Sequence, residues 1–142
     1  RLDGTKRDKH KMMLLLRSLA RNESTTVSNN KIRKAIKDIE ADDIDIDTVS
    51  SYLDALDRLL LLDNDRPFAT NVRSSVRLKQ AEKRHFSDPS IACALLNLNV
   101  NKLIGDLDTF GFMFEALVER DLKIYAEVLV LNCIIIEKMI LV

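Results

Sequence analysis

The sequence predicts an α+β fold, with amphipathic helices first and candidate strands further along the chain. Three observations support this class. Apolar residues repeat with helical spacing in three segments before residue 60; two β-prone runs flank a long basic stretch; and a further helical pattern around Glu115 precedes apolar runs of strand length. Hydrophobic residues make up 46% of the 142 residues, which is ample for a buried core.

The first half of the chain contains three amphipathic helix patterns. A polar stretch at 1–8 predicts a linker, and a helix over 8–20 follows. Ser28 is a good N-cap for the second helix and Asp47 for the third. Their apolar stripes comprise Met12, Leu15, Leu16 and Leu19, then Ile32, Ala35, Ile36 and Ile39, then Val49, Tyr52, Leu53, Leu56, Leu59 and Leu60.

Two strands are predicted next, at Leu60–Leu62 and Arg84–Ser87, joined by a long basic tip. Three helices followed by such a ribbon is the order of a winged helix-turn-helix. The solvent side of the third helix carries Asp54 and Asp57, which disfavours direct reading of a DNA groove. Residues 41–65 are strongly acidic, whereas the tip and its flanks are basic. We expect the tip to contact phosphate, or the acidic residues 41–65 of a second copy. The residues expected to make this contact are Arg66, Arg73, Arg77, Lys79, Lys83 and Arg84.

The second half opens with Asp88 as the cap of a short helix, and a longer helix is predicted over 106–125. Glu115 is the only charge between Phe110 and Val118, so we expect it to be at least partly buried. A buried carboxylate needs an ion pair, hydrogen bonds or a metal. Glu115 is therefore interpreted either as a structural residue, hydrogen-bonded or ion-paired, or as a metal ligand. Strand-like runs follow at 128–131, 133–136 and 139–142.

Several function classes are disfavoured by composition. The chain has a net charge of +0 and no apolar run approaching the roughly 20 residues of a membrane span. Its 3 glycines cannot form a phosphate-binding loop, so nucleotide hydrolysis by this chain is excluded. Two cysteines in apolar surroundings predict reduced core residues and a cytoplasmic location. His85, between Arg84 and Phe86, is interpreted as a packing or surface residue.

Three separated blocks resemble one known arrangement. They are Ile46, Thr48, Val49, Tyr52, Leu53 and Leu56; the run Lys83 to Ala92; and the run Gly111 to Val118. In this order they resemble the domain of unknown function found C-terminal to the ATPase in a large group of prokaryotic AAA+-superfamily proteins. The resemblance covers residues 1 to about 127.

The resemblance implies a winged helix over 1–87 and, over 88–142, an α/β region similar to a PD-(D/E)XK nuclease fold. In that fold a helix acid, a strand acid and an ExK strand hold a divalent metal, which implies Glu115, Glu127 and Glu137 as ligands of Mg²⁺ or Mn²⁺. The pattern is imperfect because Lys138 directly follows Glu137. The tail leaves little room to turn, so we expect polymer residues to be missing after Tyr125 and after Glu137, which would make this region incomplete.

The functional expectation is a C-terminal accessory and interaction domain of an AAA+-like ATPase, with no ATPase residues or cofactor of its own and a vestigial site at most. ATP and Mg²⁺ would belong to an upstream module of the same polypeptide, which is the expected partner together with a second copy of the chain. Two alternatives remain: a divalent-metal-dependent nuclease-like domain and a winged-helix nucleic-acid-binding module. No membrane partner is expected.

Overall fold

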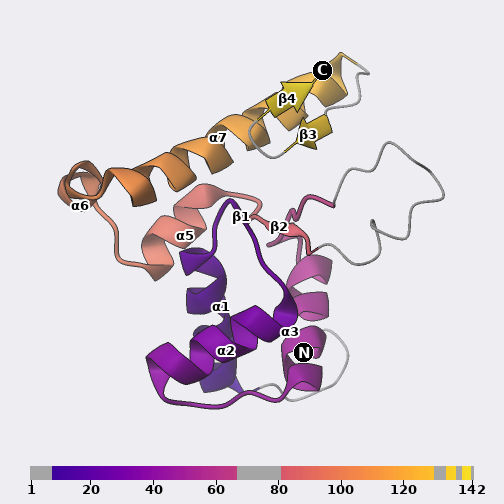
Figure 1. Ribbon diagram of the computed structural model, residues 1–142. Helices are drawn as coiled ribbons and strands as arrows, with labels where there is room; N and C mark the ends of the chain where they lie inside the picture. The colour runs from indigo at the N-terminus through magenta and orange to yellow at the C-terminus, as the bar shows by residue number, and fades with distance from the viewer. Residues whose placement is uncertain (1–7, 67–80, 130–133, 137–138, 142) are drawn as a thin grey trace.

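A computed structural model describes residues 8–66, 81–129, 134–136 and 139–141, and these residues form an α-rich α+β fold. Two small antiparallel sheets, β1 with β2 and β3 with β4, accompany the helices (Figure 1). The elements are α1 Lys9–Arg21, β1 Thr25–Thr26, α2 Asn29–Glu40, α3 Ile46–Arg58, β2 Lys83–Arg84, α5 Pro89–Leu95, α6 Val100–Gly105, α7 Leu107–Val128, β3 Ile134–Ile136 and β4 Met139–Leu141. The predicted α+β class is confirmed at this level.

The three predicted N-terminal helices all form, and side-chain caps mark where α1 and α2 begin. The Asp8 carboxylate accepts from the backbone N–H of His10, and Ser28 Oγ accepts from that of Lys31. The prediction of Asp47 as the third cap is wrong: α3 begins at Ile46, and Asp47 lies in its first turn. There its negative charge still favours the helix through the helix dipole.

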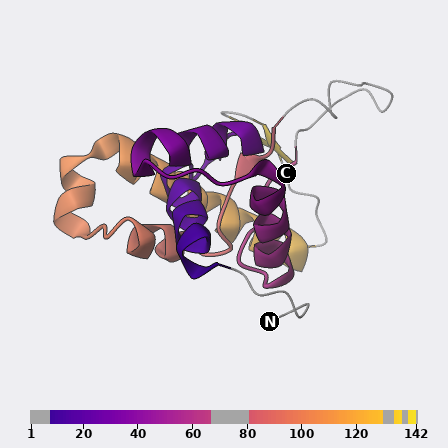
Figure 2. The ribbon, with the colours of Figure 1, turned by 90° about the horizontal axis from the view of Figure 1, so that it is seen from below.

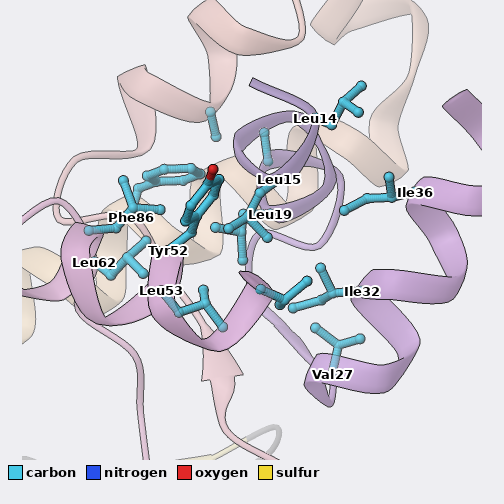
Figure 3. Packing of buried hydrophobic residues seen from close by; sticks show 14 of the residues in the cluster. Leu14, Leu15, Leu19, Val27, Ile32, Ile36, Tyr52, Leu53, Leu62 and Phe86 are labelled. Atoms are coloured by element: carbon cyan, nitrogen blue, oxygen red, sulfur yellow. The ribbon is translucent and has the colours of Figure 1, made fainter. Parts of the chain in front are cut away.

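The hydrophobic core lies where α1, α2 and α3 meet, and Figure 2 shows the three helices gathered together when seen from below. Leu15, Ile32, Ile36 and Val49 are each 0% exposed. Their side chains converge with those of Leu19, Tyr52 and Phe86 (Figure 3). Each fully buried aliphatic side chain stabilises the fold by about 1.5–3 kcal/mol, so this cluster is the main source of stability.

The small sheet closes one side of that core. β1 pairs with β2 in the register Thr25↔Arg84 and Thr26↔Lys83, and an isolated bridge joins Leu62 to Phe86. The predicted strand at Leu60–Leu62 is therefore reduced to Leu62, because Leu60 adopts a left-handed turn with φ 56°. Of the predicted strand at Arg84–Ser87, Arg84 belongs to β2 and Phe86 forms the isolated bridge with Leu62.

The second half packs α5, α6 and α7 along one side of the three-helix core (Figure 1). Asp88 caps α5, as predicted, by accepting from the backbone N–H of Ser90. The helix α6, capped by Asn99, was not expected as a separate element. Because α7 extends to Val128, the prediction of a strand beginning there is wrong. The other predicted strands coincide with β3 and β4 over the residues described.

One core spans the predicted boundary at residue 88. Ala92 of α5 and Met113 of α7 belong to the same buried cluster as α1, α2 and α3. Ser24, at a left-handed turn with φ 58°, donates through Oγ to the backbone carbonyl of Phe112 at 2.9 Å. The inner side of α7 is thereby fixed against the N-terminal half. Among the described helices, none is both long enough and apolar enough to cross a membrane.

Candidate functional site

His85 is the centre of a buried group of charged side chains. It follows β2 and is 5% exposed. Its Nδ1 lies 3.1 Å from Oε1 of Glu23, and the Glu23 carboxylate also accepts from the backbone N–H of Phe86. Because a carboxylate only accepts hydrogen bonds, this contact assigns a proton to Nδ1. The lone pair of a neutral imidazole then lies on Nε2.

Two further carboxylates face that Nε2 atom. Oε2 of Glu119 is 2.8 Å away and Oδ2 of Asp65 is 3.5 Å away. All three atoms are shielded from solvent, and none forms a properly directed hydrogen bond with any described residue. The three atoms lie within 4.8 Å of one another. We call Glu23, Asp65, His85 and Glu119, with Lys83 and Lys123, the His85 cluster.

The two lysines occupy the other oxygens of these carboxylates. Lys83 Nζ donates to Oε1 of Glu119 at 2.5 Å and also to Glu115. Lys123 Nζ lies 2.6 Å from Oδ1 of Asp65 and donates to Oδ2 of Asp63 at 2.9 Å. Glu119 and Asp65 therefore each use one oxygen for a lysine and turn the other toward His85.

The pKa values of the cluster reflect competition between burial and charge. Burial alone would lower the pKa of His85, but its contacts with Glu119 and Glu23 outweigh burial and raise the pKa to about 9. Burial would raise the pKa of Glu119, whereas His85 and Lys83 lower it overall. The pKa values of Lys83 and Lys123 are raised for the same reason: their carboxylate partners outweigh burial. In each of these four residues the shift favours the charged form.

The chemistry of the cluster follows from its lone pairs. Two carboxylate oxygens and one imidazole nitrogen converge on a small volume, where electron-rich atoms repel unless a positive charge lies between them. A proton on Nε2 supplies one such charge, and a metal cation bound by the three atoms is another. Asp65, His85 and Glu119 are the described residues placed to hold a metal.

A second feature is the exposed side of α7. Seven apolar side chains on it are between 38% and 76% exposed: Leu107, Phe110, Phe114, Leu117, Ile124, Tyr125 and Val128. The rings of Phe110 and Phe114 stack with centroids 6.1 Å apart. Single exposed apolar residues are ordinary on protein surfaces, but a continuous row marks an interaction site. We call this set the outer face of α7.

The outer face of α7 follows a heptad repeat. Leu107, Phe114, Asp121 and Val128 recur every seven residues and occupy the positions called a. Phe110, Leu117 and Ile124 recur in the same way at the positions called d. Six of these seven residues are apolar and exposed, whereas Asp121 is half-buried and accepts from the neighbouring Arg120. A heptad row of this kind is the surface by which one helix packs along another.

The acids predicted as metal ligands are not brought together. Glu115 is paired with Lys83, and its side chain is 45% exposed, so it is only partly withdrawn from water. Glu127 belongs to α7 and is exposed, so it is not a strand acid. Along one helix these two residues are about 18 Å apart, too far to share an ion. Glu137 lies outside the described residues, and a metal role for these acids stays a prediction.

The residues predicted to contact nucleic acid divide into three groups. Lys83 and Arg84 are engaged inside the protein, and Arg84 is buried, donating to Asn29 and to Glu82. Arg66 is exposed and lines an open groove of about 680 Å³ beside α3. The same groove is lined by acids, Asp54, Asp57, Asp63 and Glu82 among them. Arg73, Arg77 and Lys79 lie outside the described residues.

The His85 cluster was missed because its members are far apart in sequence. Glu23 lies in the turn after α1, Glu119 lies within a helical pattern, and His85 was interpreted as a packing or surface residue. A usable signal was present in the predicted strand and the residue before it, where the titratable residues Lys83, Arg84 and His85 directly precede Phe86. Charged residues on a strand buried on both faces need partners. Identifying those partners required the fold.

Comparison with known proteins gives one match. The model of a family described as Domain of unknown function (DUF8612) matches residues 2–102. This span includes the three-helix core, β2, α5 and the first half of α6, together with Glu23, Asp65 and His85. No curated protein and no solved structure matches.

Proposed function

We propose that this chain, which belongs to the family described as Domain of unknown function (DUF8612), is an accessory domain that joins copies of an ATPase-bearing polypeptide. The observation that carries the proposal is the outer face of α7, a heptad row of exposed apolar side chains along a helix of 22 residues. Its proposed occupant is α7 of a second copy.

Several features favour a second copy over an unrelated surface. The heptad spacing fits another helix of the same repeat. The stacked rings of Phe110 and Phe114 lie with Leu107 toward one end of the face, and Ile124, Tyr125 and Val128 lie toward the other. Antiparallel pairing places these two unlike ends together. It also separates the two Asp121 carboxylates, which parallel pairing would place opposite each other.

Gly111 adds an independent argument. It is exposed within α7, and a Cβ built there meets nothing within 4 Å. Glycine inside a helix destabilises it by roughly 0.5–1 kcal/mol relative to alanine, and no contact within the described protein requires glycine at this position. A glycine at the edge of the outer face of α7 permits the backbone of a neighbouring helix to approach closely.

The link to an ATPase is supported by the three sequence blocks that resemble the domain C-terminal to the ATPase of AAA+-superfamily proteins. The chain contains no phosphate-binding loop, so nucleotide hydrolysis would belong to another module of the polypeptide. An accessory role requires only that this domain hold copies of that module together.

Sedimentation velocity over a concentration series tests the association. We expect a dimer of the wild-type chain and a monomer of Leu117→Asp, because a charge in the apolar row cannot be paired when the two helices meet. Ile39→Asp is the matched control, since Ile39 is an exposed apolar residue, 58% exposed, on α2. It should leave the dimer intact. A wild-type chain that is monomeric at every concentration would refute the proposal that α7 of a second copy covers the outer face of α7.

ATP turnover by the complete polypeptide tests the accessory role separately. We expect Leu117→Asp to reduce turnover, while Ile39→Asp leaves it unchanged. Equal turnover in both variants would mean that joining the copies is irrelevant to an ATPase. Failure of the complete polypeptide to bind a fluorescent ATP analogue would refute the ATPase link itself.

A winged-helix nucleic-acid-binding module is the second candidate. The element order α1, β1, α2, α3, Leu62 and β2 supports it, as does the pairing of β1 with β2 and of Leu62 with Phe86. The acids around the groove at α3 argue against binding there, which leaves Arg66 and the basic tip. DNA affinity that falls with salt and with Arg73→Ala plus Arg77→Ala is the expected result. Salt-independent or absent binding would exclude this candidate.

A further inference from the structure

We propose that Asp65, His85 and Glu119 form a binding site for a divalent transition-metal cation, with Zn²⁺ as the best fit, that fastens α7 to the N-terminal half of the domain. The observation is geometric: one atom from each residue, His85 Nε2, Glu119 Oε2 and Asp65 Oδ2, is buried and lacks a hydrogen bond to any described residue. The same three residues each place one ligand atom within 4.8 Å of the other two.

The balance of charge in the cluster is compatible with a cation. Glu119 is paired with Lys83 and Asp65 with Lys123, while Glu23 contacts His85. With a neutral imidazole, these three acids and two lysines leave one uncompensated negative charge, which is costly in buried surroundings. A proton on His85 or a bound cation can compensate this charge, so the geometry of the ligand atoms carries the proposal.

The type of ligand atom selects the class of metal. Imidazole nitrogen suits Zn²⁺ and neighbouring transition metals, whereas Mg²⁺ and Ca²⁺ prefer oxygen ligands alone. Bonds of about 2.0–2.1 Å in tetrahedral geometry separate ligand atoms by about 3.3 Å. The observed Nε2 distances, 2.8 Å to Glu119 and 3.5 Å to Asp65, need changes of only a few tenths of an ångström.

Glu23 supplies the outer contact that metal-bound histidines usually make. Such a histidine donates its second ring N–H to a carboxylate or carbonyl, which orients the ring and fixes its tautomer. His85 Nδ1 makes this contact with Glu23 at 3.1 Å, and Glu23 is itself held by the backbone N–H of Phe86. When a metal displaces the proton from Nε2, the lone pair of that atom is thus already directed toward Glu119 and Asp65.

The burial of the site defines its role. The three ligand atoms are shielded from solvent, whereas a catalytic zinc keeps a position open to water and substrate. The ligands come from three separate segments: the stretch after α3, the stretch after β2, and the middle of α7. A cation bound by all three joins α7 to the small sheet, so its role is structural.

Isothermal titration of the chelator-treated chain with Zn²⁺ is the direct test, and titration with Co²⁺ gives an optical signal from the metal's ligands. We expect one ion per chain, visible Co²⁺ bands typical of low coordination number, and a higher unfolding temperature with metal. Glu23→Gln should weaken affinity by about 10- to 100-fold, because it removes an outer contact of the histidine. His85→Gln should abolish binding.

Three matched variants separate this site from its alternatives. Glu115→Gln alters the second partner of Lys83, and Asp63→Asn that of Lys123, without touching a proposed ligand. His10→Gln removes the other histidine, which is exposed and 3.0 Å from Asp42. All three should bind one ion as the wild type does. Loss of binding in Glu115→Gln or in His10→Gln would place the metal elsewhere and overturn the proposal.

If the His85 variant fails to fold, metal titration of the wild-type chain alone still tests whether the site binds a cation. Absence of saturable Zn²⁺ and Co²⁺ binding by the folded wild type would leave the cluster a network of ion pairs with a protonated histidine. Binding without any rise in unfolding temperature would overturn the structural role. Asp65→Asn provides a further check, since Asp65 is the least buried ligand, with a side chain 19% exposed.

Discussion

The helices α2 and α7 face the rest of the protein in opposite ways. α2 buries Ile32 and Ile36 and directs its charged residues to solvent. α7 buries Glu119 between two alanines, Ala116 and Ala126, and exposes most of its large apolar residues. The first helix is held mainly by the hydrophobic effect, and the second largely by ion pairs and hydrogen bonds.

This difference shows that apolar content alone does not decide which side of a helix is buried. Lys83, His85 and Lys123 need partners because each is largely withdrawn from water. Glu119 supplies one, and Asp63 and Asp65 supply the others. Apolar residues on the opposite side of α7 then remain exposed. If α7 pairs with a second copy, as proposed, the two helices separate folding from association within one chain.

The largest loss of stability is expected when a core side chain of α2 is truncated. Ile36→Ala should lower the free energy of unfolding by about 2–5 kcal/mol, because Ile36 is 0% exposed and its truncation leaves a cavity. Ile39→Ala, on the same helix but 58% exposed, should change it by less than about 0.5 kcal/mol. Urea unfolding followed by circular dichroism measures both. Similar losses in the two variants would contradict the packing described for α2.

The next largest loss of stability is expected when a buried ion-paired residue of α7 is changed. Without metal, Glu119→Gln is expected to cost about 2–3 kcal/mol, because it removes a charged hydrogen-bonding partner from buried surroundings. The remaining contacts of Lys83 with Glu115 and of His85 with Glu23 keep the loss below that of an isolated buried charge. Glu115→Gln, whose side chain is 45% exposed, should cost less than about 1 kcal/mol.

Urea unfolding in the presence of a chelator measures this second pair and separates it from any effect of bound metal. Equal losses in Glu119→Gln and Glu115→Gln would mean that burial does not distinguish the two acids. A gain in stability for Glu119→Gln would show that desolvation of the cluster exceeds its internal attraction, and the proposed basis for the attachment of α7 would fail.

The sequence was sufficient for α1, α2 and α3 because apolar spacing and local caps determine such helices. Ser28 and Asp88 cap as predicted, since an N-cap depends only on residues a few positions away. The orientation of α7 could not be predicted in this way. Phe110, Phe114 and Leu117 have the spacing of core residues in the sequence, but they are exposed in the structure. The long-range contacts of Glu119 turn another side of α7 toward the protein.

The metal prediction failed to find the His85 cluster for a related reason. Glu115 was singled out as the charge with the most apolar neighbours in sequence, but Glu119, one helical turn later, is the acid that is buried. The two differ by about 40° around the helix axis, which places one beside His85 and the other at the rim. Such a difference depends on how the helix is rotated against the sheet, and the sequence does not state that rotation.

The smallest expected losses of stability come from removing one helix cap in each half of the domain. Ser28→Ala and Asp88→Ala should each cost about 1 kcal/mol at neutral pH, because each removes an acceptor from the start of a helix. Hydrogen bonds from Ser90, with Arg120 of α7 nearby, hold the pKa of Asp88 below its ordinary value. Its ionisation therefore contributes stability above its unfolded-state pKa of about 3.9, and this contribution is lost as pH falls through the lower folded-state pKa.

Ser28 is uncharged, so the loss in Ser28→Ala should be the same at pH 7 and at acid pH. The loss in Asp88→Ala should instead shrink as pH falls below the folded-state pKa of Asp88, because the wild type then also lacks the carboxylate. Urea unfolding at a series of pH values measures both differences. A cost of Asp88→Ala that stays constant with pH would show that the hydrogen bond to Ser90 does not depend on the charge, and that the two halves of the domain are capped by equivalent means.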